Sequence, residues 1–232
     1  MFEIRHADER GQFNYGWLET AHTFSFGPYT DLDHMNFRAL RVINENKLQP
    51  GQGFLDYPHR NVEVLSYVLA GELSHRDSVG NQATLEAGSM QCLSAGSGVV
   101  HSEYNSSTNS KLHFLQIWLR PSTLDTPPRY QQHCFSAQDK QGRLCLLASG
   151  DGAQGSLQVQ QDVKLYATLL RPGQTVEVNG APERYLWLQV VRGGVEVNGQ
   201  PLSRGDGGGL NGYHRIEIQG TEDSELLIFD LA

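Results

Sequence analysis

Short runs in which apolar and polar residues alternate recur along the whole chain, and sustained helical periodicity is almost absent. Four runs rich in β-branched and aromatic residues are bounded by glycine, asparagine, aspartate or proline: 62–69, 112–119, 185–191 and 225–231. A period of two with such boundaries is typical of β-strands. We therefore predict strands at these four runs and an all-β fold.

Turn signals separate the runs. The chain has 25 glycines, and Asn198-Gly199 is a two-residue hairpin signal between short alternating segments. Val79-Gly80-Asn81 marks another turn, and the polar stretch 121–155, which contains Pro127-Pro128, reads as a connector. Strands at regular spacing with such turns indicate a barrel or a sandwich.

An internal repeat divides the chain into two halves. The segment LQPGQ at 48–52 returns as LRPGQ at 170–174, and in both halves a second glycine, Gly71 or Gly193, stands 20 positions after the first. Each second glycine follows an aromatic and aliphatic run. This pattern favours a tandem duplication. We predict two antiparallel β-barrels, one over residues 1–125 and one over 126–232.

Charge and cysteine usage narrow the functional class. The formal net charge is −8, which argues against direct binding to nucleic acid or to an anionic membrane, because both require clustered positive charge. No apolar run of signal-peptide or membrane-span type is present, so we expect a cytoplasmic protein. The three cysteines form no paired set and are expected to be free, buried thiols in a reducing compartment.

Candidate chemistry is confined to the first half. Tyr57 and His59 form one i, i+2 pair, and His101 and Glu103 form another; on a strand, residues two apart point to the same face. If the two strands face one barrel interior, these four side chains converge. Two histidines and one carboxylate are the set that holds non-haem Fe(II) with open positions. The corresponding positions of the second half are Asn179 and Ala181, which form no such set.

Several ordered motifs resemble those of pirin and the bacterial pirin-like proteins. The resemblance covers nearly the whole chain, and its motifs are HTFSFG (22–27), LRVIN (40–44), PGQGF (50–54), PHR (58–60), YVLAG (67–71), SAG (94–96) and HSE (101–103). The resemblance implies a bicupin of two jelly-roll-type barrels with one metal in the N-terminal barrel, held by three histidines and one glutamate. It also implies quercetin 2,3-dioxygenase activity, as some members show, or the regulatory role of the eukaryotic member, a nuclear transcriptional cofactor.

One position departs from the family pattern. The first motif is His-x-His in the family, whereas Tyr57 stands at the first histidine here. The metal ligands that carry over are His59, His101 and Glu103, and Tyr57 is a candidate fourth. A phenol, with a pKa of about 10, must lose its proton to bind. Three states stay open: Tyr57 ligates the metal as phenolate, it swings away and leaves three ligands, or the site is empty. We expect one divalent transition metal if any, Fe(II) first, with Ni, Cu, Zn or Mn as alternatives.

The expected function is a dioxygenase acting on a flavonol such as quercetin, with Glu103 as the catalytic group that accepts the substrate's hydroxyl proton. A metal-free or metal- and redox-sensing binding protein that regulates through an unknown protein partner is the alternative. A metal-free isomerase using His59 and Glu103 is the third hypothesis.

Three other side chains are further candidates for the site. Glu63 is the second candidate carboxylate ligand after Glu103, and the sequence does not determine which face of its strand it lies on. His113 is interpreted as a satisfied barrel histidine, and His75, beside the charged Arg76-Asp77, is expected to be solvated.

Overall fold

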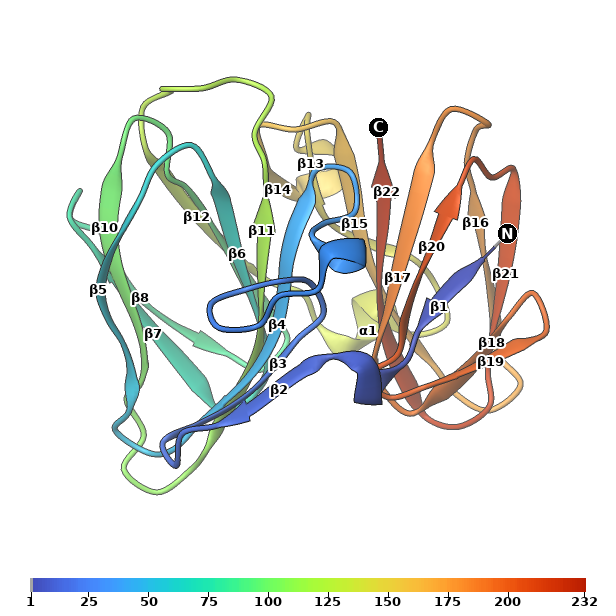
Figure 1. Cartoon of the computed structure of the whole chain (residues 1–232), viewed down its shortest axis with the longest axis horizontal. Coiled ribbons are helices and arrows are strands. Elements are labelled where there is room, and N and C mark those ends of the chain that lie inside the picture. The colour runs from blue at the N-terminus through green and yellow to red at the C-terminus, as the bar shows by residue number, and fades with distance from the viewer. Residues whose placement is uncertain (1) are drawn as a thin grey trace. The chain divides into compact units, whose positions relative to one another are not determined.

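The computed structural model describes residues 2–232 and is built almost entirely of antiparallel strands (Figure 1). It divides into two compact units. The N-terminal unit comprises residues 11–134 and 157–161, and the C-terminal unit comprises residues 2–10, 135–156 and 162–232. The all-β, two-barrel prediction is confirmed, while the domain bounds 1–125 and 126–232 stay a prediction.

Two facing sheets build the N-terminal unit. The large sheet has the order β12-β9-β6-β11-β4-β3-β2 and the small sheet β5-β10-β7-β8. In Figure 1 the small sheet forms one wall of this unit, and β6, β11 and β4 form the wall opposite. The strands are β2 (Gly11–Asn14), β3 (Leu18–His22), β4 (Leu40–Leu48), β5 (Gly53–His59), β6 (Glu63–Ala70), β7 (Glu72–Asp77), β8 (Gln82–Glu86), β9 (Ser89–Ser94), β10 (Val99–Asn105), β11 (Leu112–Leu119), β12 (Arg129–Cys134) and the short β14 (Leu157–Gln158).

The C-terminal unit repeats this plan. Its small sheet has the order β16-β21-β18-β19, and its large sheet contains β1-β20-β17-β22-β15-β13. The strands are β1 (Glu3–Arg5), β13 (Cys145–Ser149), β15 (Val163–Leu170), β16 (Thr175–Asn179), β17 (Tyr185–Arg192), β18 (Gly194–Val197), β19 (Gln200–Ser203), β20 (Gly207–Asn211), β21 (Arg215–Gly220) and β22 (Ser224–Leu231). Helical structure is limited to α1 (Ala137–Lys140) and the 3₁₀ turns η1 (Ala7–Glu9), η2 (Leu32–His34) and η3 (Ala153–Gly155).

The repeated glycines occupy equivalent turns. Gly71 and Gly193 each end the long strand β6 or β17, with φ of +79° and +71°. A Cβ at Gly71 would lie 2.6 Å from the carbonyl oxygen of Lys111, and one at Gly193 would lie 2.3 Å from that of Asp223. Both positions therefore need glycine for the same two reasons, the left-handed backbone and the close approach of another strand. The strand orders and these turns together support the duplication.

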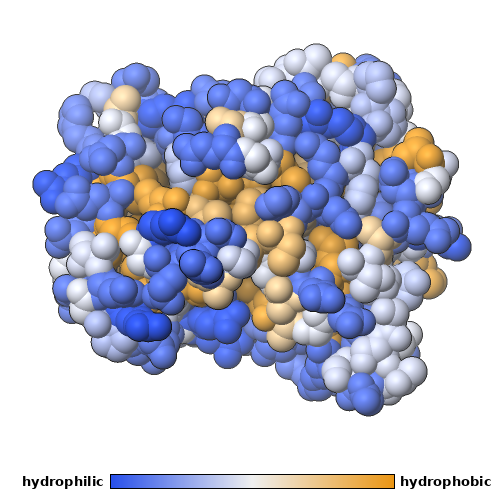
Figure 2. All heavy atoms as spheres, turned by 180° about the vertical axis from the view of Figure 1, so that it is seen from behind, coloured by the Kyte–Doolittle hydropathy of each residue, from blue (hydrophilic) through white to orange (hydrophobic). Residues whose placement is uncertain are grey.

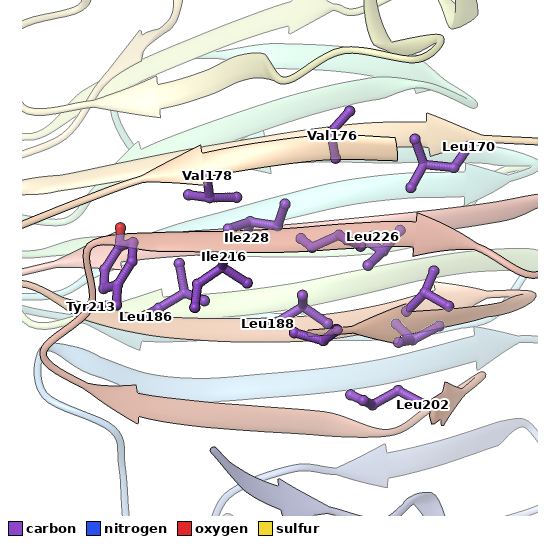
Figure 3. Packing of buried hydrophobic residues seen from close by; sticks show 14 residues of the cluster. Leu170, Val176, Val178, Leu186, Leu188, Leu202, Tyr213, Ile216, Leu226 and Ile228 are labelled. Carbon is purple, nitrogen blue, oxygen red and sulfur yellow. The ribbon is translucent and has the colours of Figure 1, made fainter. Parts of the chain in front are cut away.

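Apolar side chains fill the space between the two sheets of the C-terminal unit (Figure 3). Leu186 and Leu188 of β17 and Ile228 of β22 pack with Val178 of β16 and Ile216 of β21, and all are buried. The alternating pattern of β16 and β21, exposed and buried in turn, places their apolar residues on the inner face. Burial of this apolar surface stabilises the unit.

The surface shown in Figure 2 is predominantly hydrophilic, with apolar residues visible between the polar ones. Within residues 2–232 no helix is long and apolar enough to cross a membrane. All three cysteines are free, as expected, but only Cys92 is buried, whereas Cys134 is exposed and Cys145 is partly exposed. The expectation of buried thiols is thus wrong for Cys134, which lies at the exposed end of β12.

Candidate metal centre

Three neighbouring strands of the small sheet carry the candidate residues of the N-terminal unit. In the antiparallel register β5-β10-β7, His101 of β10 lies opposite Tyr57 of β5 and opposite Asp77 of β7. Glu103 lies opposite His75. Residues directly opposite each other in such a pair share a face, so β7 adds side chains to the face that carries His101 and Glu103.

Glu103 is held by the large sheet. Its Oε1 accepts hydrogen bonds from Ser66 Oγ and Gln91 Nε2, and its Oε2 accepts one from Gln116 Nε2 at 2.7 Å. The side chain is 1% exposed. A carboxylate has about four acceptor positions, so these three bonds fix its orientation and leave one position free on Oε2.

The three donors belong to a row of polar residues that crosses the large sheet. Gln116 of β11 pairs with Ser66 of β6, which pairs with Gln91 of β9, and Asn44 of β4 pairs with Gln116 on the other side. All four are buried. A buried polar row is stable only where its groups are hydrogen-bonded, and Glu103 supplies the acceptor for three of them. This row explains why one barrel interior is polar.

The two histidines predicted as ligands lie side by side. The ring centroids of His59 and His101 are 4.9 Å apart, and both residues are buried. Burial, followed by the neighbouring His101, lowers the pKa of His59 to about 4, although Glu103 opposes the shift. Burial also lowers the pKa of His101, again against the attraction of Glu103. Both imidazoles are therefore neutral near pH 7 and can offer a lone pair.

Tyr57 lies at the exposed side of the pair. Its side chain is 59% exposed, and its ring centroid is 5.2 Å from that of His59. The phenol thus lies next to His59 and is largely exposed, and its role as a metal ligand stays a prediction. Among the three open states of Tyr57, this position corresponds to a side chain turned outward.

His75 is where the sequence interpretation was wrong. The expectation of a solvated histidine is overturned, because His75 is 2% exposed and its Nε2 lies 3.1 Å from Asp77 Oδ2. Its ring stacks on Tyr130, with centroids 4.5 Å apart. The missed signal is the parity of β7: Leu73, His75 and Asp77 alternate with exposed Glu72 and Arg76. The charged neighbours therefore point outward and His75 points inward.

Glu63 and His113 lie outside the cluster. Glu63 is three residues from Ser66 on β6, so it faces the opposite side of the sheet, where its carboxylate accepts from Ser94 Oγ at 2.7 Å. Burial raises its pKa against this bond and one from the backbone of Gln160. His113 Nε2 lies 3.0 Å from Glu45 Oε1, a satisfied histidine as interpreted. The open facing of Glu63 is thus resolved.

The donor set fits a transition-metal ion. His75, His101 and Glu103 each offer a ligand atom, and these atoms lie within 4.8 Å of one another. The Nδ1 atoms of His75 and His101 are buried and have no hydrogen-bond partner among residues 2–232. Orphaned buried nitrogens are costly, and a metal would satisfy them. Imidazole and carboxylate together suit divalent Fe, Ni, Cu or Zn.

Residues 3–119 match the model described as Pirin, and residues 146–231 match the Quercetinase C-terminal cupin domain. The chain belongs to the pirin family. The resemblance noted from the motifs is thereby confirmed, as is the bicupin fold.

Curated relatives and solved structures cover the full chain. A protein of Escherichia coli named quercetin 2,3-dioxygenase is 46% identical over 100% of this chain and 99% of its own length. A pirin-like protein of Caulobacter vibrioides is 36% identical, with both chains fully covered. The crystal structure of YhhW from Escherichia coli superposes with a TM-score of 0.96 at 44% identity, covering 100% of this chain and 98% of that one. Bacterial pirin YhhW in complex with nickel(II), at 45% identity, gives a TM-score of 0.94 over 100% and 99% of the two chains.

Proposed function

We propose that this pirin is a metal-dependent dioxygenase that acts on a flavonol such as quercetin. The observation that carries the proposal is the pair of buried, neutral imidazoles of His59 and His101 beside the fixed carboxylate of Glu103 in the N-terminal unit. The relative named quercetin 2,3-dioxygenase and the nickel(II) complex of a similar pirin support the substrate class and the metal.

Within this proposal His59, His101 and Glu103 hold one divalent metal. Fe(II) is the metal we propose, and when bound it supplies the redox chemistry through which dioxygen attacks an electron-rich ring. The imidazoles are suited to this role because burial keeps them neutral. Tyr57, the fourth candidate ligand, stays a prediction.

Substrate reaches the site beside His59. A pocket of about 370 Å³ is lined by Pro58, His59, Arg60, Ser78, Gly98, Val99 and Val100. Its apolar residues can pack against an aromatic ring, while His59 forms the boundary with the buried cluster. A flavonol seated here presents its hydroxyl groups toward the polar interior and leaves its far ring in the pocket.

Glu103 is placed to accept a proton. Its Oε1 is occupied by two donors, so the one free position is on Oε2, which would take the proton of a substrate hydroxyl while leaving or sharing the metal. Gln116 donates to the same oxygen and holds it in place. The ionised substrate is the more electron-rich form and the one that dioxygen attacks.

Oxygen uptake tests the proposal. Purified protein loaded with Fe(II) or Ni(II) is expected to consume dioxygen and bleach quercetin, and Glu103→Gln is expected to lose at least 10²-fold in rate. His113→Gln, which changes a histidine outside the cluster, serves as the control and should retain the wild-type rate. A protein that binds metal but consumes no oxygen with any flavonol would contradict the dioxygenase proposal and favour the regulatory alternative.

A further inference from the structure

His75 occupies a position that the proposed function does not yet use. It projects from β7 into the same interior as His101 and Glu103, and it lies directly opposite Glu103 in the strand register. Its side chain is fully buried. A buried histidine must satisfy two ring nitrogens, and only one of those of His75 is accounted for.

Asp77 determines which nitrogen of His75 carries the proton. Asp77 Oδ1 accepts hydrogen bonds from the backbone N–H groups of Val79 and Asn81, and its Oδ2 accepts one from Asn81 Nδ2 at 2.8 Å. This carboxylate can only accept. Because Asp77 Oδ2 lies 3.1 Å from His75 Nε2, that nitrogen bears the hydrogen, and Nδ1 is the nitrogen that can offer a lone pair.

The lone pair of His75 points to no other group that the structure describes. Nδ1 is buried without a hydrogen-bond partner in residues 2–232, as is Nδ1 of His101. A ring nitrogen fixed by a carboxylate on one side and free on the other is the arrangement typical of metal-ligating histidines. His75 therefore has the features of a ligand.

Tyr130 fixes the plane of the His75 ring. The two rings stack with centroids 4.5 Å apart and planes inclined by 22°. The Tyr130 hydroxyl donates to Gln91 Oε1 at 2.9 Å, and Gln91 donates through Nε2 to Glu103. One ring stack and two hydrogen bonds thus link the imidazole of His75 to the carboxylate of Glu103.

We propose that His75 is a metal ligand of this site and supplies the imidazole that the first motif lacks because Tyr57 stands there. The contrast between the two residues supports this: Tyr57 is 59% exposed, while His75 is 2% exposed and offers a ligand atom within 4.8 Å of those of His101 and Glu103. The ligand set then comprises His59, His75, His101 and Glu103, with Asp77 positioning His75. This inference rests on the metal site of the proposed function.

Nickel titration of the full-length protein tests the assignment. We expect His75→Gln to weaken Ni(II) binding by at least about tenfold, as measured by calorimetry, because replacing even the partners of metal ligands costs 10–100-fold. Asp77→Asn is expected to weaken binding less, since the imidazole remains. His113→Gln is the matched control and should bind Ni(II) as the wild type does.

Pulsed electron paramagnetic resonance of the Cu(II) form separates a ligand from a structural residue. One fewer coordinated imidazole in His75→Gln than in the wild type is expected, with an unchanged count in His113→Gln. An equal count in His75→Gln and the wild type, or a greater loss of Ni(II) affinity in Tyr57→Phe than in His75→Gln, would overturn the assignment while leaving the metal site intact. Absence of Ni(II) binding to the wild type would overturn both the metal site and this inference.

Discussion

The two barrels share one strand order and differ in what fills them. In the N-terminal unit, the inward residues of β5, β10 and β7 are polar: His59, His101, Glu103 and His75. In the C-terminal unit, the inward residues of the counterpart strands β16, β21 and β18 are apolar: Val178, Ile216, Ile218 and Val197. The large sheets differ in the same way. The row Asn44-Gln116-Ser66-Gln91 crosses one, and the row Tyr166-Ile228-Leu188-Gly208 crosses the other.

This difference shows that the backbone plan does not determine chemistry. The same arrangement of strands accommodates a hydrophobic core or a hydrogen-bonded polar interior, and function resides in the side chains grafted onto it. A polar interior is less favourable by itself, because buried polar groups lose their hydration. The N-terminal unit compensates by bonding three donors to one carboxylate.

The largest expected effect comes from placing a charge in the apolar barrel. Ile218 is 0% exposed among apolar neighbours, so Ile218→Glu should lower the free energy of unfolding by about 3–5 kcal/mol, the range for an uncompensated buried charge. Urea denaturation measures it. Ile218→Val is the control and should cost about 0.5–1.5 kcal/mol. A tolerated glutamate would mean that the two interiors do not differ in the way described.

The converse change removes the charge from the polar barrel. Glu103→Leu leaves Ser66, Gln91 and Gln116 without their acceptor, so we expect it to destabilise the protein by about 2–3 kcal/mol, as buried unsatisfied donors do. Glu103→Gln should cost less, because the amide oxygen still accepts. Urea denaturation of the two variants measures how much the hydrogen bonds to residue 103 contribute to the free energy of unfolding. A Glu103→Leu protein more stable than Glu103→Gln would show that the three donors do not depend on Glu103.

The smallest expected effect concerns Glu63, a buried acid on β6. It lies on the face of the large sheet that points away from Glu103. Burial raises the pKa of Glu63 above its ordinary value of 4.5. At a pH between 4.5 and the raised pKa, the Glu63 carboxyl group therefore keeps its proton in the folded protein and loses it in the unfolded chain. Stability should therefore fall as pH rises from about 4.5 to the raised pKa, by less than about 1.4 kcal/mol per pH unit.

Glu63→Gln should remove that part of the slope in urea titrations between about pH 4 and pH 7. It should leave Ni(II) binding unchanged, because Glu63 lies outside the metal cluster. A loss of Ni(II) affinity would show that its facing has been assigned wrongly.

The sequence predicted the barrels because strand periodicity and repeated glycines are local signals. It also predicted the alternation that brings His101 and Glu103 to one face of β10. The role of the polar row was not predictable, because Gln116, Ser66 and Gln91 are distant in the chain and meet only through strand register. That register is a property of the assembled sheet.

His75 was misjudged for a related reason. Arg76 and Asp77 suggest a charged, solvated hairpin when adjacent residues are considered together, although in a strand neighbours face opposite sides. Arg76 is exposed and contacts Asp56, whereas Asp77 turns inward to His75. The outward position of Tyr57 depends on how β5 lies at the edge of its sheet, which no local pattern specifies.

The central claim is that the reaction centre lies in the polar interior of the N-terminal unit alone. Crystals soaked in Ni(II) and measured at the nickel absorption edge test it most directly, because anomalous scattering locates the ion. We expect one strong peak per chain, within coordination distance of His59, His75, His101 and Glu103. A peak in the C-terminal unit would contradict this claim. So would a map whose only peaks are ions bound to surface histidines.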